Sequence, residues 1–347
     1  MPSADNEFKG HESDGFRKYQ FQRLGQALVL MLHTWSVMIA WAIFASLWFL
    51  PQGPLLALLY LLHIFLSSAG TSGRLDRRSN RLRCSWFSKA FTSYFPCELH
   101  RSAPLPNSRK YVLGYHPHGI ICHGAFASFA TDVTGFSTLF PGITNVLLTL
   151  DSNFKIPIYR EYILSMGLGG VSRSSCHEIL SQGGSDGRGA GRAITIAVGG
   201  ARESLLAKPG SMKLFIRGRI GFIRIAIRQG ADVVPVLGFG ENQLYDRIDS
   251  DMPPFVLKLQ MLLKDYLGWT LPLFYGRSFF GGGWGFMPHR EPLHVVVGRP
   301  VEVTQQDNPD ASYIEQIHQA YVNEIWRTWN EWKHKLPLNS VSELELL

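Results

Sequence analysis

The chain has 347 residues, of which 46% are hydrophobic and 12% aromatic, so it can build a full core and is not a disordered protein. Charged residues make up only 18%, and the formal net charge is +7. The basic residues form no zinc-finger, homeodomain or RNP pattern, which argues against a nucleic-acid-binding module. We interpret the positive charge as a surface for membrane lipid and an anionic cosubstrate, with an ordinary basic surface as the alternative.

The N-terminal part divides into a polar tail and an uncharged segment. Residues 1–23 are polar and mixed in charge, and we expect them to form a loose cytosolic tail. Residues 24–73 contain no Asp, Glu, Lys or Arg. A soluble core rarely needs so long an uncharged run, so a buried helix pair is the weaker interpretation.

We therefore predict a transmembrane helical hairpin over residues 24–72, divided by the turn signal Pro-Gln-Gly-Pro at 51–54. Leu28–Leu50 is long enough to cross a hydrocarbon layer of about 30 Å. Leu55–Ala69 would reach only about 22 Å at the same helical rise. The hairpin is thus either two helices, the second one short, or a re-entrant loop.

Charges on both sides of the hairpin predict its topology. Positive residues precede it at Arg17, Lys18 and Arg23 and follow it at Arg74, Arg77, Arg78, Arg81 and Arg83. Because positive residues favour the cytosolic side, both ends are predicted to lie in the cytosol. The four cysteines, Cys84, Cys97, Cys122 and Cys176, have no disulfide or CxxC spacing and are expected to be reduced there.

Residues 73–347 are predicted to form one catalytic α/β domain. Short apolar strands are expected at Tyr111–Tyr115, Thr144–Leu150, Ile194–Val198, Val233–Phe239 and Leu293–Val297. Helical patterns lie between them at Ile120–Thr131, Ile158–Met166, Arg217–Gln229 and Pro254–Leu267. This alternation indicates a mainly parallel sheet flanked by helices.

A long amphipathic helix is predicted near the C-terminus. It should begin at a capping box, Ser312–Glu315. One face carries Ile317, Tyr321, Ile325, Trp329 and Trp332. We expect this face to pack on the sheet rather than to contact a membrane.

The string His116-Pro117-His118-Gly119 follows the first predicted strand. Ligands bind at strand ends in open α/β sheets, and histidine titrates near neutral pH, so the imidazoles are candidates for a general base. Gly119 would let a substrate approach closely. A structural histidine, or a metal site formed by His116, His118 and His123, are the alternatives.

A second candidate string, Gly199-Gly200-Ala201-Arg202-Glu203, follows the strand Ile194–Val198. The amides of Gly199 and Gly200 are candidates for an oxyanion site, and Glu203 for orienting a histidine. A tight turn with a cap is the plainer interpretation.

A third feature is a row of arginines. Arg217, Arg224 and Arg228 are spaced along one predicted helix face, with Arg219 nearby. Such a row suits phosphate groups through forked hydrogen bonds, although a solvated face is nearly as good an interpretation.

Taken in order, these motifs resemble the type-2 diacylglycerol acyltransferase and monoacylglycerol acyltransferase family. The resemblance rests on Tyr94-Phe95-Pro96, the string at 116–119, Asn153–Arg173, Val198–Ser204, Arg219–Asn242 and Trp332-Lys333-His334-Lys335. It covers most of the chain after residue 20. The family is distantly similar to the glycerol-phosphate acyltransferases, whose active site has an Asp five residues after His. Ile121 and His123 stand at that spacing here, so the carboxylate must come from elsewhere, and Glu203 is our candidate.

The resemblance implies direct acyl transfer from acyl-CoA to diacylglycerol, making triacylglycerol, with His116, His118 and Glu203 as catalytic residues. Arg173, Arg219 and Arg224 would bind the coenzyme A phosphates, and Gly221–Gly230 with Val234–Val236 would shape the floor of the site. No further cofactor is expected. The expected location is the endoplasmic reticulum membrane or a lipid-droplet surface, with Trp269–Phe286 at the lipid, and a homo-oligomer is compatible with the sequence.

Three rival functions stay open at this point. Monoacylglycerol or a fatty alcohol could replace diacylglycerol as the acceptor. A metal-dependent hydrolase could use His116, His118 and His123 with further carboxylate ligands. A non-catalytic lipid-surface protein would need only the hairpin.

Overall fold

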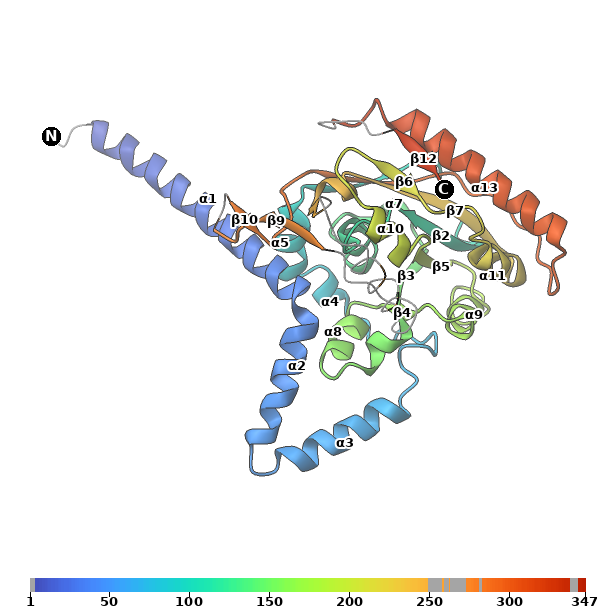
Figure 1. Ribbon diagram of the computed structural model, residues 1–347, viewed down its shortest axis with the longest axis horizontal. Helices are drawn as coiled ribbons and strands as arrows, with labels where there is room; N and C mark the ends of the chain where they lie inside the picture. Colours follow the sequence, from blue (N-terminus) through green and yellow to red (C-terminus); the bar gives the residue numbers. More distant parts are fainter. Residues whose placement is uncertain (1–3, 249–257, 259–261, 263–272, 281–282, 338–342) are drawn as a thin grey trace.

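The computed structural model describes residues 4–248, 258, 262, 273–280, 283–337 and 343–347. Its central feature is a seven-stranded sheet in the order β1-β11-β7-β2-β5-β3-β4 (Figure 1). The strands are β1 Cys97–Arg101, β2 Lys110–His116, β3 Thr144–Thr149, β4 Gly169–Gly170, β5 Arg192–Ala197, β7 Ala231–Phe239 and β11 Leu293–Val297. All neighbours are parallel except β11 and β7. The mainly parallel α/β sheet and its five predicted strands are confirmed.

Helices cover both faces of this sheet because its side chains alternate between two cores. On β2, Tyr111, Leu113 and Tyr115 join one core, whereas Val112 joins the other. The first core packs against α1 Ala4–Thr34, α5 Trp86–Tyr94, α6 His123–Ala125, η2 Phe126–Ala130, α7 Phe136–Leu139 and α8 Tyr159–Ser165. The second packs against α9 Arg173–Ser181, α11 Gly221–Gln229 and α13 Ala311–Trp332.

Short elements complete the described chain. Two small sheets pair β6 Met212–Leu214 with β12 Leu344–Leu346, and β8 Asp246–Arg247 with β9 Phe274–Arg277 and β10 Trp284–Gly285. The remaining helical turns are α4 Asn80–Arg83, η3 Asp151–Lys155, α10 Ala201–Leu206 and η4 Glu241–Gln243.

Several helix boundaries correct the prediction. The helix predicted from Arg217 begins at Gly221, so Arg217 precedes α11. The predicted helix at 120–131 is the short α6 followed by π-helical η2. The capping box was wrong: Asp310 is the N-cap of α13, and its carboxylate accepts the Tyr313 N–H at 2.7 Å. The predicted helix Pro254–Leu267 lies almost wholly outside the described residues.

The predicted face of α13 does pack on the sheet. Ile317, Tyr321, Ile325 and Trp329 are buried in the second core. The Trp332 indole N–H donates a hydrogen bond to the Ser102 hydroxyl at 2.9 Å. This helix therefore lies along the sheet from β2 toward β1.

The N-terminal segment is helical where a loose tail was expected. α1 begins at Ala4, because residues 4–23 contain no proline to interrupt a helix. The chain bends by 70° where α1 meets α2 Ser36–Ser46. It continues through η1 Leu47–Phe49 and turns back in α3 Gly53–Leu66.

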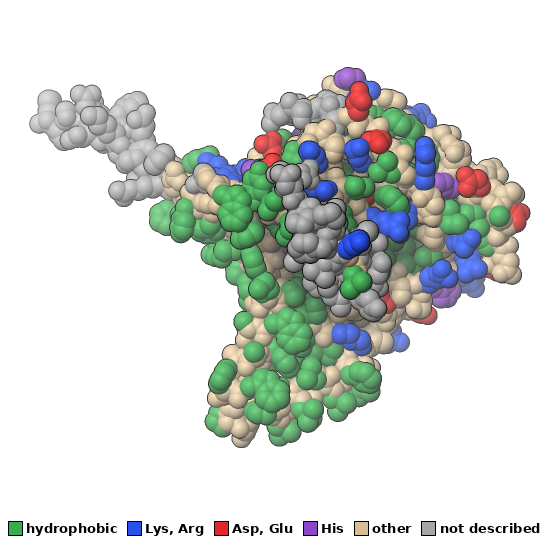
Figure 2. Space-filling view, in the orientation of Figure 1, with side chains coloured by type: hydrophobic (Ala, Val, Ile, Leu, Met, Phe, Trp, Pro, Cys, Tyr) green, Lys and Arg blue, Asp and Glu red, His purple; other side chains and the backbone are tan. Residues whose placement is uncertain are grey.

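The described residues contain no single helix with the length and apolar character of a membrane span. The bent pair Tyr19–Thr34 and Ser36–Phe49 meets those criteria jointly, and α3 is a shorter apolar helix. α2 and α3 project from the α/β domain (Figure 1), and apolar side chains cover their visible surface (Figure 2). Phe49 is 89% exposed and Phe65 76% exposed.

Candidate active site

A cavity of about 220 Å³ opens where the parallel strands β2, β5 and β3 end. The carboxyl ends of parallel strands meet at one sheet edge, which is where α/β folds bind ligands. His118 and Gly200 lie in its wall. Most of the remaining lining is apolar, and Thr149 and Ser204 add two hydroxyl groups. The apolar residues are Ile120, Leu148, Leu150, Val171, Ile196, Ala197 and Ala201. The lining suits a hydrophobic substrate near one imidazole.

His118 is the predicted catalytic histidine that reaches this cavity. Its Nδ1 lies 3.1 Å from the carbonyl oxygen of Gly119, which can only accept a hydrogen bond. Nδ1 therefore carries the hydrogen, and Nε2 of the neutral ring keeps a free lone pair. An imidazole in this tautomer can accept a proton through Nε2.

His116 is completely buried and turned away from the cavity. Its Nε2 lies 3.0 Å from the hydroxyl of Tyr321 on α13. Its Nδ1 lies 3.5 Å from Oε1 of Glu203, an ion-pair distance too long for a hydrogen bond. The ring is thus held between a carboxylate and a tyrosine, which suits a positioning role.

Glu203, in the first turn of α10, is 2% exposed. Oε2 accepts the backbone N–H of His118 at 2.8 Å, and Oε1 accepts that of Phe215 at 2.8 Å. The carboxylate therefore lies at the predicted histidine pair, where it fixes the backbone of His118 and faces the ring of His116.

The paired glycines have different surroundings. Gly200 has φ of +54°, caps α10 and lines the cavity beside Ala201. Gly199 is buried, and a Cβ there would lie 1.9 Å from the Glu203 carboxyl carbon. Gly200 is therefore placed at the substrate, whereas Gly199 makes room for Glu203.

Gly119 also makes room for a carboxylate rather than for substrate. Its φ is +60°, and a Cβ there would lie 2.6 Å from Cγ of Glu241. Glu241 is buried and accepts hydrogen bonds of 2.8 Å each from the Tyr115 hydroxyl and the backbone N–H groups of His123 and Gly124. Burial raises the pKa of Glu241 from 4.5 to about 7. Sequence reasoning missed this residue, although it stands in the resembling stretch Arg219–Asn242.

His116, His118 and His123 do not form a metal site. His116 contacts Tyr321 of α13, on one face of the sheet. His123 lies in the opposite layer, where its Nε2 is 2.9 Å from the Tyr245 hydroxyl and its ring is 5.0 Å from that of Phe95. The hydrolase alternative therefore lacks its ligand set.

Three of the predicted arginines line a groove between α9 and α11, whereas Arg217 and Arg219 lie outside it. Arg173, Arg224 and Arg228 line a cavity of about 350 Å³, with Ser174, His177, Glu178, Gly221, Ile225 and Gln229. All three arginines are exposed. Val171 lines the His118 cavity and Arg173 lines the groove, so the chain passes from one cavity to the other within three residues. Another cavity, of about 600 Å³, lies elsewhere at Ser67–Ala69 and is lined by no predicted site residue.

Arg219 lies apart from this groove. Its Nη2 donates to the carbonyl oxygen of Gly199 at 3.1 Å, and its guanidinium lies 5.5 Å from the ring centroid of Phe215. Burial lowers the pKa of Arg219, and the nearby Arg202 lowers it further. Arg219 thus supports the Gly199–Gly200 turn.

The chain is similar to known acyltransferases over most of its length. The family described as diacylglycerol acyltransferase matches residues 46–347. Diacylglycerol O-acyltransferase 1 of Schizosaccharomyces pombe is 38% identical over 322 residues, covering 92% of this chain and 91% of that protein. Diacylglycerol O-acyltransferase 2A of Umbelopsis ramanniana is 43% identical over 76% of this chain and 73% of its own. 2-acylglycerol O-acyltransferase 1 of Homo sapiens is 40% identical over 76% and 78%.

A solved structure, the 1-acyl-sn-glycerophosphate acyltransferase PlsC from Thermotoga maritima, is similar over 90% of this chain and 98% of its own. Its TM-score of 0.41 and identity of 14% are too low to carry an argument. The expected likeness to glycerol-phosphate acyltransferases stays a prediction.

An imidazole thus lies in the wall of a largely apolar cavity at the carboxyl ends of the parallel strands. The chain belongs to the diacylglycerol acyltransferase family, as its motifs predicted, and it is an acyltransferase.

The raised pKa of Glu241 predicts a measurable pH dependence of stability. Between pH 4.5 and about 7 the folded chain binds a proton that the unfolded chain has released. The contribution of this group to the free energy of unfolding therefore falls as the pH rises through that window. The free energy of unfolding of the wild type minus that of Glu241→Gln should fall by on the order of 3 kcal/mol as the pH rises through this window.

Denaturant unfolding of the detergent-solubilised chain at several pH values measures this difference. Glu315→Gln, which changes an exposed carboxylate on α13, should reproduce the wild-type pH curve. A difference for Glu241→Gln that stays flat or rises over the window would contradict the prediction.

Proposed function

We propose that the chain transfers an acyl group from acyl-CoA to the free hydroxyl of diacylglycerol, without a covalent enzyme intermediate. The observation that carries this proposal is that His118, one of the two histidines predicted as candidates for the base, lines a largely apolar cavity. The names of the relatives support the choice of acyl acceptor. No cofactor other than the acyl-CoA cosubstrate enters this scheme.

In the proposed reaction, Nε2 of His118 removes the proton from the acceptor hydroxyl. The oxygen attacks the thioester carbonyl, and a tetrahedral intermediate forms. When the C–S bond breaks, the acyl group stays on the acceptor, and His118 gives its proton to the departing thiolate. Proton transfer of this kind typically contributes about 10²–10⁴-fold to the rate.

The roles of the neighbouring residues follow from their contacts. Glu203 holds the His118 backbone, and His116 faces Glu203 from the sheet side, so both act through position. The backbone amide of Gly200, at the cavity wall, is the proposed donor to the developing oxyanion. One such donor is typically worth about 3–4 kcal/mol in the transition state.

The groove of Arg173, Arg224 and Arg228 is the proposed site for the phosphates of coenzyme A. Guanidinium groups bind phosphate through paired hydrogen bonds, and three of them concentrate positive charge in one cavity. The segment 171–173 runs from the His118 cavity to the groove, and the proposed path of the thioester end of the donor follows it toward the imidazole. Arg219 is assigned to the support of the Gly199–Gly200 turn instead.

We propose that the α2–α3 hairpin enters one leaflet of the endoplasmic reticulum membrane and returns to the cytosol. Each arm has about 14 helical residues, or roughly 21 Å, which is shorter than a hydrocarbon layer of about 30 Å. The exposed apolar surface of the hairpin supports immersion in lipid. The ring of Phe286, on the predicted lipid-facing stretch, lies 6.2 Å from that of Trp35. Both segments can therefore face the same lipid surface, including that of a lipid droplet.

A 2-acylglycerol acceptor is the second candidate. The human and bovine 2-acylglycerol O-acyltransferases are 40% and 41% identical to this chain, close to the values for the diacylglycerol enzymes. Labelled acyl-CoA supplied with diacylglycerol, 2-acylglycerol and fatty alcohol in separate reactions distinguishes the acceptors. A labelled triacylglycerol product from diacylglycerol alone supports the first proposal.

The first functional prediction concerns the base. His118→Ala should lower kcat for acyl transfer by roughly 10²–10⁴-fold, because the imidazole on the cavity is lost. The variant should keep the wild-type melting temperature, since His118 is only half-buried. His116→Phe should instead lower activity and melting temperature together, because the buried contacts to Glu203 and Tyr321 are lost. Wild-type turnover in folded His118→Ala would refute the assignment.

The second prediction concerns the donor phosphates. Arg224→Gln and Arg228→Gln should each raise KM for acyl-CoA roughly tenfold, the typical loss for one charged hydrogen bond. Their KM for an acyl-pantetheine, which lacks the nucleotide phosphates, should not change. Arg217→Gln is the matched control, because Arg217 is exposed but lies before α11 and outside the groove. An unchanged KM for acyl-CoA in the double variant would remove the groove from the site.

The third prediction concerns the hairpin tip. Replacing Trp48 and Phe49, which are 55% and 89% exposed, by Glu should shift the chain from the floating to the unbound fraction in liposome flotation. Burying two carboxylates in hydrocarbon is unfavourable. Trp326→Glu on α13, 39% exposed, is the control and should float as the wild type does. Equal flotation of the tip variant would argue against insertion.

A further inference from the structure

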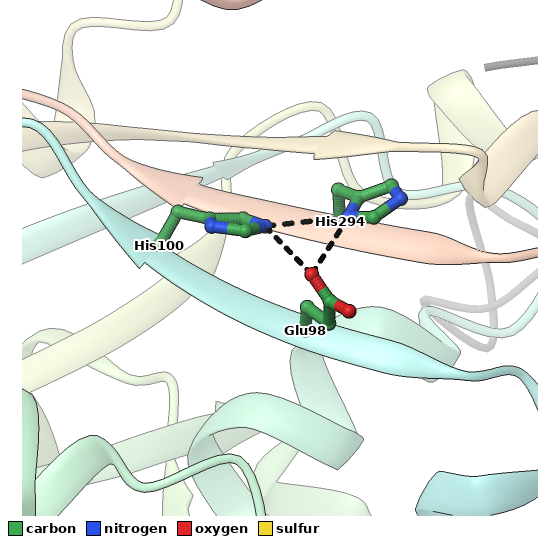
Figure 3. A group of neighbouring side chains, drawn as sticks. All are labelled: Glu98, His100 and His294. Carbon is green, nitrogen blue, oxygen red and sulfur yellow. Dashed lines mark hydrogen bonds and ion pairs between the residues drawn. The ribbon is translucent and has the colours of Figure 1, made fainter. Parts of the chain in front are cut away.

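Two histidines and a glutamate converge where the edge strand β1 pairs with β11 (Figure 3). Glu98 and His100 are alternate residues of β1 and share one face of the sheet. His294 stands opposite Glu98 in the parallel register. The three side chains therefore come together from two adjacent strands, on rigid backbone.

The distances between the ligand atoms form a nearly equilateral triangle. Nε2 of His100 and Nδ1 of His294 are 3.2 Å apart. Oε2 of Glu98 lies 3.5 Å from the first and 3.6 Å from the second. Donor atoms bound at about 2.1 Å to one tetrahedral zinc ion lie about 3.4 Å from one another. The triangle therefore has the dimensions of one face of a zinc coordination sphere.

Hydrogen bonding accounts for only one side of this triangle, because Nε2 of His100 and Nδ1 of His294 are within hydrogen-bond distance of one another. The carboxylate oxygen is too far from either nitrogen for a hydrogen bond, yet it is nearly equidistant from both. The other nitrogen of His294, Nε2, is buried without a hydrogen-bond partner among the described residues. The ring is thus anchored from the Nδ1 side, where the other two ligands meet.

We propose that Glu98, His100 and His294 bind a zinc ion. Two imidazoles and one carboxylate are ordinary zinc ligands, and water would take the fourth position. The His294 side chain is 5% exposed and that of Glu98 63% exposed, so the ion has a firm inner ligand and an open path from solvent.

The proposed ion would be structural. β1 is the edge strand and has only β11 as a neighbour in the described sheet. An ion bound to both strands would fasten this edge, and the ring of Trp332 on α13 lies 5.1 Å from that of His100. None of the three ligands lines the His118 cavity, so the zinc proposal does not depend on the proposed acyl transfer.

Zinc content and zinc affinity of the full chain in detergent test the proposal. The chain, carried on a tag without histidine and stripped with a chelator, should take up one zinc ion and melt at a higher temperature with zinc. Glu98→Gln and His100→Ala should weaken zinc binding by roughly tenfold or more, since losing even a residue that only hydrogen-bonds a metal ligand typically costs 10–100-fold. Both positions are solvent-accessible, so these variants can fold.

His334→Ala is the matched control, because it removes an exposed imidazole near the end of α13 and should bind zinc as the wild type does. Magnesium, which prefers oxygen ligands, should leave the melting temperature unchanged. A wild-type chain that holds no stoichiometric zinc and melts alike with and without it would overturn the proposal. So would variants of Glu98 and His100 that both keep the wild-type zinc affinity.

Discussion

The buried carboxylate of Glu203 holds together the two loops on which the candidate site depends. It accepts the N–H of His118, after β2, and the N–H of Phe215, after β6, at 2.8 Å each. Hydrogen bonds to a charged group are typically worth about 1.5–3 kcal/mol each, and a buried N–H left without an acceptor costs a comparable amount. The loop that carries His118 therefore has one strongly favoured conformation. In this conformation the imidazole already lies in the cavity wall.

A second carboxylate fixes the same loop from the opposite face of the sheet. Glu203 follows β5 and Glu241 follows β7, and these are the two strands that flank β2. Each carboxylate packs against a glycine: Gly199 against Glu203, and Gly119 against Glu241. The glycines of both motifs thus exclude a Cβ where a carboxylate must fit. Gly199 and Gly119 therefore support the site from behind. Gly200 and His118 are the residues of the two motifs that line the cavity.

The elements that could be predicted from the sequence are those with a local pattern of apolar residues. Buried strands are short apolar runs, so all five predicted strands have counterparts in the sheet, and the sheet edge that bears His118 follows from their parallel order. β1 was missed because Cys97–Arg101 is largely polar, which is typical of an edge strand with one open side. The start of α11 and the cap of α13 were misplaced because several adjacent residues fit a helix start equally well.

Roles that depend on long-range contacts could not be predicted from local patterns. The string at 116–119 gave no sign that His116 points toward α13 while His118 turns to the cavity, since that split depends on where Tyr321 packs.

The helix α13 connects these separate features along one face of the sheet. Tyr321 contacts His116, the ring of Trp329 stacks on Phe239 at 5.3 Å, and Trp332 lies over His100. Since the three side chains are carried by one continuous helix, a shift of α13 would disturb all three contacts together. The apolar face that buries the helix therefore also fixes His116, next to the His118 loop, and His100, on the edge strand β1. The His118 backbone is held in turn by Glu203, whose carboxylate also faces the His116 ring that Tyr321 contacts.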